Sequence, residues 1–226
     1  MEPRPQTEYT FFNFFCYLFY VPLYVAGPIL TFNSFIAQYS VPFSNNETRP
    51  TYVAIYFLRI AAAVLLLEVM MHLIYVMAIG SSQAWAGFSS LQLLMLAYLS
   101  LKFVWLKFLV IWRFFRAWAL LDGVYSVENM NRCMSNNYSA AGFWRSWHRS
   151  FNRWLIRYMY IPLGGAPYNY LNMWVIFGFV GFWHDVSLNV IIWGWLICLF
   201  LLPEMFCIWL FSLPQLAKVG FSTCLI

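Results

Sequence analysis

Long apolar runs separated by short polar segments dominate the chain. Thr51 to Ile79 and Phe88 to Trp112 are each long enough to cross a bilayer as a helix, because about 20 apolar residues suffice. Lys102 and Lys107 interrupt the second run near one end, where long cationic side chains can reach the membrane interface. The runs do not alternate apolar and polar residues as membrane β-strands do, so the sequence predicts an all-α, polytopic membrane protein.

Two further apolar segments are shorter than a standard crossing, and a third is long. Tyr9 to Tyr20 is short and leads into VPLYVAGPILTFNSF, whose prolines and glycine favour a re-entrant or in-plane helix. Tyr170 to Trp183 is also shorter than a standard span, and Val186 to Phe211 is apolar to beyond Pro203. By contrast, Leu121 to Ala141 is rich in asparagine, serine and charge, so we expect it to form a water-facing loop.

Composition agrees with a membrane protein. Hydrophobic residues make up 63% of the chain and charged residues 9%, against about 25% charged residues in soluble domains. The net charge of +5 is not gathered in a tail, which disfavours nucleic acid as a partner and is compatible with anionic head groups or a phosphorylated substrate. The five cysteines show no CxxC pair or ligand-like cluster, so we expect no metal site. Residues 1–226 are predicted to form a single membrane domain.

Charge is concentrated in one stretch, GFWRSWHRSFNRWLIRYMYIPLGG. Its arginines recur every fourth residue with aromatic side chains opposite, which predicts an amphipathic helix over residues 142–160 that ends before Pro162 and a turn at Gly164-Gly165. This row consists of Arg145, Arg149, Arg153 and Arg157. The row either contacts lipid head groups while tryptophans anchor the helix, or partly faces a cavity and binds donor phosphates. Arg113 and Arg116 could join it.

Two histidines are candidates for chemistry. His184 follows the apolar run VIFGFVGFW, where an ionisable side chain is costly and is usually kept for function or for a specific partner. His148 is a weaker signal by itself, because a histidine beside an aromatic face is more often structural. His72 lies four residues after Glu68, which favours a hydrogen bond within one helix over a catalytic role.

The segment FWRSWHRSFNRWLIRYMYIPLGG, followed by FVGFWHD, resembles the signature of the membrane-bound O-acyltransferases (MBOAT), and PLYVAGPILTFNSFIAQYS resembles an upstream segment of that family. The similarity runs from about Tyr20 to Glu204 and is strongest to the glycerol-uptake (Gup-type) proteins, which are related to Hedgehog acyltransferases. His184 matches the family's catalytic histidine, and His148 matches a second position that is His, Asn or Asp in different branches. Family members carry additional amino-terminal spans, so we expect this chain to hold the carboxyl-terminal part of an MBOAT-like helical core pierced by a reaction chamber.

The resemblance implies transfer of a long-chain acyl group from acyl-CoA to a hydroxyl of a lipid or GPI-anchor-type acceptor in the endoplasmic reticulum membrane. Imidazole has a pKa near neutrality, so we expect His184 to be the general base and His148 to orient the acceptor or polarise the thioester. Direct pairing of Asp185 with His184 is not expected, because neighbouring helical residues point about 100° apart. The chemistry requires no metal or cofactor besides the acyl-CoA substrate. The alternatives are a catalytically inactive MBOAT-like scaffold or regulator, and a protein acyltransferase-like member.

Overall fold

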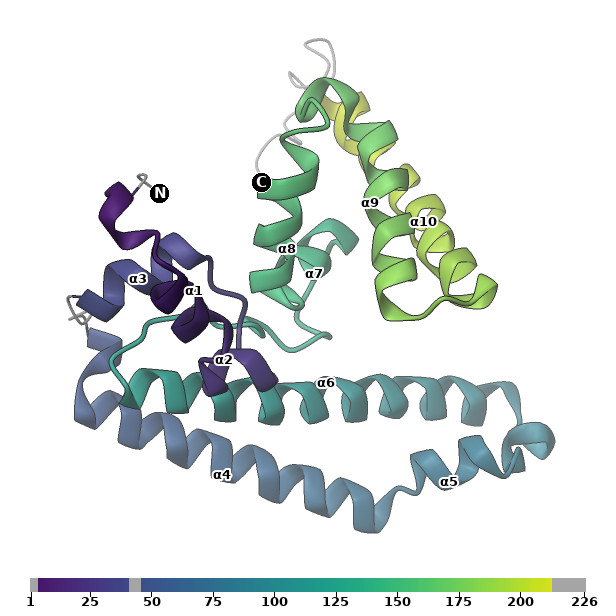
Figure 1. The fold of residues 1–226 in the computed structure, drawn as a ribbon. Helices are drawn as coiled ribbons and strands as arrows, with labels where there is room; N and C mark the ends of the chain where they lie inside the picture. Colours follow the sequence, from purple (N-terminus) through teal and green to yellow (C-terminus); the bar gives the residue numbers. More distant parts are fainter. Residues whose placement is uncertain (1–3, 41–45, 213–226) are drawn as a thin grey trace. The chain divides into compact units, whose positions relative to one another are not determined.

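The computed structural model describes residues 4–40 and 46–212, and every regular element in these ranges is a helix (Figure 1). The chain divides into two compact units, which are described separately. The first unit comprises residues 1–136 and 146–151, and the second comprises residues 137–145 and 152–226. The predicted all-α class is confirmed for the described residues, whereas a single domain over residues 1–226 stays a prediction.

A long helical hairpin forms the base of the first unit (Figure 1). It consists of α4 (Pro50–Leu73), α5 (Val76–Ser81), η3 (Ala84–Gly87) and α6 (Ser90–Leu121). The run predicted from Thr51 to Ile79 is therefore interrupted, because Ile74 adopts an extended conformation between α4 and α5. At the start of α6, Ser89 and Gln92 form a capping box in which each side chain binds the other residue's backbone N–H. α6 continues nine residues beyond the predicted end of the span at Trp112.

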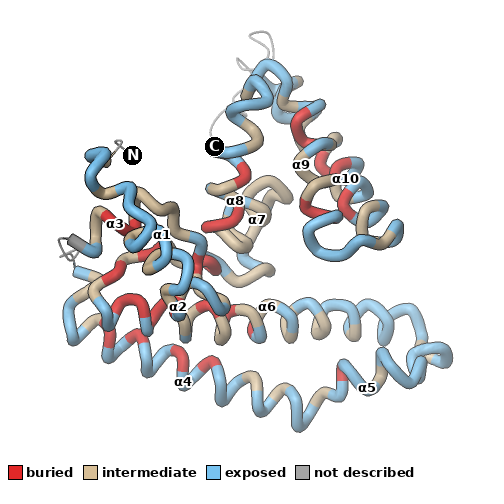
Figure 2. The backbone as a smooth tube through the Cα atoms, viewed as in Figure 1, coloured by how far each residue is buried: buried red, intermediate tan, exposed pale blue. Residues whose placement is uncertain are grey.

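Helices α4 and α6 pack along only part of their lengths, and the rest of their apolar surface is exposed (Figure 2). Their contact buries Tyr56, Ile60 and Ala63 of α4 and Leu106, Leu109 and Ala117 of α6. A helix that stays apolar on its exposed faces suits lipid rather than water. By length and composition, α4, α6 and α10 (Leu188–Ser212) are the three described helices able to cross a membrane.

Short helices form the amino-terminal part of the first unit. They are α1 (Phe11–Leu18), α2 (Val21–Val25) and α3 (Phe32–Ser40), and none is long enough to span a bilayer, as the sequence predicts for this region. The chain turns sharply after α2 at Gly27, where an added Cβ atom would clash with the carbonyl oxygen of Pro22. Tyr20 donates a 2.7 Å hydrogen bond to Asp122 at the end of α6, and burial together with this bond raises the pKa of Tyr20.

The second unit is a helical hairpin with a short helix packed on it. The hairpin is formed by α9 (Asn169–His184) and α10, and the short helix is α7 (Ala140–Ser146). Gly194 permits the close approach of α9 and α10, because a Cβ there would lie 2.7 Å from the carbonyl oxygen of Phe177. Glu204 of α10 accepts hydrogen bonds from the backbone N–H groups of Ala140 (2.7 Å) and Ala141 (3.3 Å). A carboxylate is stabilising at a helix amino terminus, so this contact fastens α7 to the hairpin.

A glycine turn in the second unit generates the first prediction. Gly164 has φ +95°, and an added Cβ would lie 2.6 Å from the Tyr168 ring. We expect Gly164→Ala to lower the free energy of unfolding by about 1–3 kcal/mol, because alanine is strained at positive φ and also meets the ring. Thermal unfolding in detergent would measure the change. Gly80→Ala is the matched control, since a Cβ at that helical position meets no atom within 4 Å. Equal destabilisation of both variants would contradict the prediction.

Candidate active site

His148 lies at a break in the segment that the sequence predicts to be one helix. Helix α7 ends at Ser146, and α8 (Arg149–Leu155) begins one residue after His148. The backbone of His148 has φ +44°, in the left-handed region. Its ring stacks on Trp112 of α6, with centroids 4.4 Å apart and planes 22° apart, and lies 5.2 Å from the ring of Phe151.

The continuous amphipathic helix expected over residues 142–160 is therefore not what the structure shows. The left-handed residue changes the chain direction, and the carboxyl-terminal part of the segment, Ile156–Tyr160, is a π-helical turn (η4). A left-handed conformation costs a residue with a Cβ about 1–3 kcal/mol, so the surroundings must hold it. Such strain gathers at functional sites, and neither glycine nor proline marks this position in the sequence.

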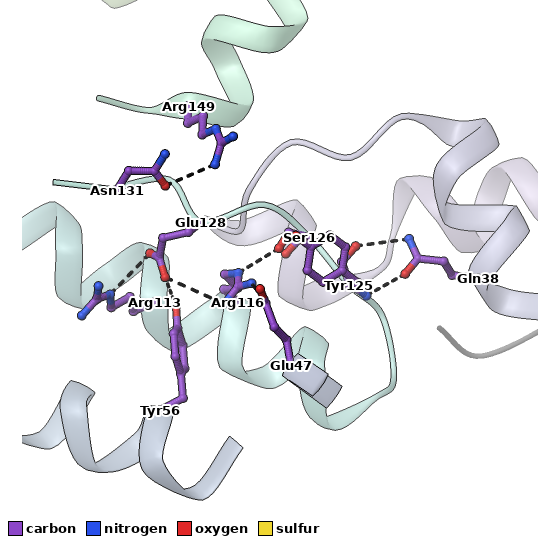
Figure 3. Close-up of polar contacts among 10 residues, drawn as sticks. All are labelled: Gln38, Glu47, Tyr56, Arg113, Arg116, Tyr125, Ser126, Glu128, Asn131 and Arg149. Carbon is purple, nitrogen blue, oxygen red and sulfur yellow. Dashed lines mark hydrogen bonds and ion pairs between the residues drawn. The ribbon is translucent and has the colours of Figure 1, made fainter. Parts of the chain in front are cut away.

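In the connecting loop, residues 122–139 between α6 and α7, residues 123–130 are buried or half-buried, whereas residues 131–139 are half-buried or exposed. Ser126, Asn129 and Met130 are each 2% exposed or less. The sequence predicts a water-facing loop here from its polar composition, and residues 131–139 agree with that prediction. Residues 123–130 do not, because their polar groups bind other parts of the first unit. Gln38 of α3, for example, accepts from the backbone N–H of Tyr125 (2.7 Å) and donates to its carbonyl oxygen (3.2 Å), as Figure 3 shows.

Asn129 of the connecting loop caps the amino terminus of α8. Its backbone oxygen accepts from the N–H of Arg149 (3.1 Å), and its side-chain Oδ1 accepts from the N–H of Ser150 (3.0 Å). The Ser150 hydroxyl in turn accepts from the N–H of Ile29, at 2.8 Å. The first N–H groups of a helix lack partners within the helix, so these contacts fix where α8 begins.

An ion cluster joins the connecting loop to α4 and α6 (Figure 3). Its members are Glu47, Tyr56, Arg113, Arg116 and Glu128. The Arg116 guanidinium is 2% exposed; it pairs with Glu47, lies 3.8 Å from the Glu128 carboxylate, and donates from Nε to the carbonyl oxygen of Ser126 at 2.8 Å. Glu128 also accepts from Tyr56 (2.7 Å) and from Arg113 (3.4 Å).

This pairing corrects the suggestion that Arg113 and Arg116 join the row of donor-binding arginines. Both guanidiniums are already occupied by carboxylates of the first unit. A buried cation without a counter-charge is strongly unfavourable, so the cluster is explained by the fold alone. The sequence contains no local signal for this cluster. Arg116 contacts both Glu47 and Glu128, and neither lies within a few helical turns of it along the chain.

His184 lies at the carboxyl end of α9 in the second unit and is exposed. Its ring is edge-on to Trp183 (4.9 Å) and to Trp193 of α10 (5.8 Å). Partial desolvation lowers the pKa of His184 from its usual value near 6.5, which favours the neutral imidazole. Asp185 continues in extended conformation, and within the described chain it makes no hydrogen bond to His184.

The four arginines of the row have different surroundings. Arg145 on α7 and Arg153 on α8 are exposed, as is Arg157 in the π-helical turn, where its guanidinium lies 5.9 Å from the Tyr158 ring centroid. Arg149 is half-buried and donates to the Asn131 side chain at 3.4 Å (Figure 3). His148 and Arg149 belong to the first unit, and the other three arginines belong to the second together with His184.

An apolar groove of about 500 Å³ lies on the hairpin of the second unit. Trp174, Val175 and Gly178 of α9 line one side and Trp195 of α10 lines the other. No titratable side chain lines this groove, so it offers contact to an apolar chain rather than to a charged group.

Comparison with known proteins identifies the family. The family described as MBOAT, membrane-bound O-acyltransferase, matches residues 2–226. The chain belongs to the membrane-bound O-acyltransferase family. Membrane-bound O-acyltransferase GUP1 of Millerozyma farinosa is 47% identical over 208 residues, which cover 91% of this chain and 41% of the relative. GUP1 of Saccharomyces cerevisiae is 44% identical over 211 residues, covering 92% of this chain and 37% of the relative.

A more distant MBOAT relative is protein-cysteine N-palmitoyltransferase HHAT of Mus musculus. It is 33% identical over 174 residues, covering 74% of this chain and 35% of the relative. These relatives confirm the predicted resemblance to the Gup-type branch and its more distant relation to HHAT. The chain spans about two fifths of the length of the GUP1 relatives.

The ion cluster generates the second prediction. Tyr56→Phe removes the 2.7 Å hydrogen bond to the Glu128 carboxylate and leaves the ring in place. We expect the free energy of unfolding to fall by about 1.5–3 kcal/mol, which is typical for a hydrogen bond to a charged group. Chemical unfolding in detergent would measure it. The control is Tyr52→Phe, one turn earlier on α4, whose hydroxyl has no partner in the described part of the chain. A loss for Tyr56→Phe no larger than the control's would contradict a stabilising role for this bond.

Proposed function

We propose that the protein transfers a long-chain acyl group from acyl-CoA to a hydroxyl of a lipid or GPI-anchor-type acceptor. Membership of the MBOAT family supports acyl transfer, and the GUP1 relatives are named O-acyltransferases. The observation that carries the proposal is the state of His184. Its imidazole is exposed at the end of an apolar helix, with a pKa lowered toward the neutral form that accepts a proton.

In the proposed reaction, a ring nitrogen of His184 takes the proton of the acceptor hydroxyl while the oxygen attacks the thioester carbonyl carbon. The carbon–sulfur bond then breaks, and the leaving thiolate of CoA receives the proton back from the imidazolium. The products are the ester and free CoA, and His184 returns to its neutral state. His148 either orients the acceptor or donates a hydrogen bond to the thioester carbonyl oxygen as negative charge develops there. The reaction needs neither a metal nor a redox cofactor.

The arginines are proposed to hold the phosphates of the donor. Guanidinium groups suit this role because they form forked hydrogen bonds to phosphate oxygens. Three of the four are exposed and can reach a phosphate group: Arg145, Arg153 and Arg157. The half-buried Arg149 donates a hydrogen bond to Asn131, so its role is to support the fold. The apolar groove beside Gly178 offers a surface for the acyl chain. The alternative role of the exposed arginines is contact with anionic lipid head groups.

Two other functions compete with this proposal. A protein acyltransferase-like activity is favoured by the similarity to a relative named protein-cysteine N-palmitoyltransferase. A catalytically inactive scaffold or regulator would keep the fold but would not need both histidines, and His148 and His184 are both present. We further propose the endoplasmic reticulum membrane as the location, with membrane lipids as surroundings and a lipid or glycolipid as acceptor.

His184→Ala is the third prediction and tests the proposed function. General-base assistance contributes about 10²–10⁴-fold to rate, so we expect transfer of a radiolabelled acyl group from acyl-CoA in the whole protein to fall by that factor. In the parent, the rate should rise with pH and level off, with a midpoint below 6.5, because protonation of His184 removes the base and its pKa is lowered. This acidic limb should disappear in the variant.

His72→Ala provides the matched control, since His72 is exposed on α4 and its Nδ1 lies 2.8 Å from the Glu68 carbonyl oxygen. It should transfer acyl groups at the parent rate. A folded His184→Ala protein that binds acyl-CoA and retains both the parent rate and its pH profile would reject the general-base role. It would favour the scaffold function.

A further inference from the structure

His148 is held in a strained conformation by contacts on both sides of it. On the amino-terminal side, the N–H of Asn131 donates to the carbonyl oxygen of Ser146 at 3.5 Å. On the carboxyl-terminal side, the Asn129 backbone and side chain accept from the first two N–H groups of α8, at 3.1 and 3.0 Å. The connecting loop therefore brackets the two residues at which the helix breaks.

Of these three hydrogen bonds, only the one accepted by the Asn129 side chain requires a particular residue type, because the other two join backbone groups. Its Oδ1 is the acceptor for Ser150, and the whole residue is 0% exposed, so water cannot replace the contact cheaply. Asparagine is among the strongest capping residues because its oxygen reaches the N–H groups of a first helical turn. Here it performs that role from a separate segment, about 20 residues before α8.

The neighbours of Asn129 fix its position. Glu128 is held by Tyr56 and Arg113, and Met130 packs in the same buried cluster as Trp112. Trp112 is also the residue on which the His148 ring stacks. The backbone and the ring of His148 are thus set by one packed neighbourhood, with Asn129 as its link to α8.

We propose that Asn129 is a positioning residue for His148, acting through the amino terminus of α8. It holds the left-handed backbone, and so keeps the imidazole stacked on Trp112 in the orientation used for acyl transfer. The proposal rests on the proposed function in that His148 takes part in the reaction. The geometric part can be tested without any activity.

The test is a spectroscopic signature of the stack in the whole protein. The chain contains three histidines, so selective isotope labelling of histidine gives few ring signals, and His72→Gln and His184→Gln assign the remaining one to His148. Stacking on an indole face shifts the His148 ring protons upfield. We expect this shift in the parent, its loss in Asn129→Ala and in the milder Asn129→Ser, and its retention in Asn129→Asp, which keeps an oxygen at the same reach.

Activity supplies the second readout. We expect Asn129→Ala to lower kcat, by up to about 10²-fold for a displaced catalytic group, with the KM for acyl-CoA unchanged. Asn129→Asp should restore part of kcat. Asn152→Ala is the matched control, because Asn152 lies on α8 and its side chain makes no hydrogen bond within the described residues. It should leave both the His148 signal and kcat as in the parent.

The outcomes separate the two proposals. A folded Asn129→Ala or Asn129→Ser protein with the His148 signal unshifted from the parent would overturn the positioning role. If neither folds while Asn129→Asp does, Asn129 serves the fold as a whole, and a specific role for His148 is rejected. If the parent shows no acyl transfer but the His148 signal responds as expected, the positioning inference stands and the proposed function fails.

Discussion

The burial of one guanidinium organises the first unit. Arg116 lies on a helix of a chain that has few charges, and desolvating an ion costs several kcal/mol unless counter-charges and hydrogen bonds surround it. Glu47, from the segment before α4, and Glu128, from the connecting loop, supply that compensation. Both polar segments are therefore drawn onto α6. The fold around His148 follows from this, because the residues next to Glu128 cap α8 and pack beside Trp112.

The sequence predicts the parts of the fold that depend on local pattern. Helices α4, α6 and α10 appear where long apolar runs were found, because length and hydropathy are properties of the segment itself. The break-prone region near Pro22 and Pro28 forms short helices instead of a span. The spacing of His72 and Glu68 predicts a contact within one helix, and the 2.8 Å separation of Nδ1 from the Glu68 carbonyl oxygen confirms it.

The features that the sequence does not predict depend on distant partners. The left-handed turn at His148 needs Asn129 and Trp112, which no local period reveals. The connecting loop looks hydrated by composition, yet its residues 123–130 are buried or half-buried because their polar groups bind α3, α6 and α8. For the candidate site, the motifs single out both histidines. The stacking of His148 on Trp112 and the edge-to-face contact of His184 with Trp193 come only from tertiary packing.

The central claim is that the buried Arg116 guanidinium organises the first unit by binding Glu47 and Glu128. The most direct test is hydrogen exchange of the whole protein in detergent, comparing the parent with Glu128→Gln, which removes one of the two counter-charges. We expect faster exchange in the variant at the backbone N–H groups of Arg149 and Ser150, because both are bound by Asn129, the neighbour of Glu128. Unchanged exchange at both groups in a folded Glu128→Gln protein would contradict the account.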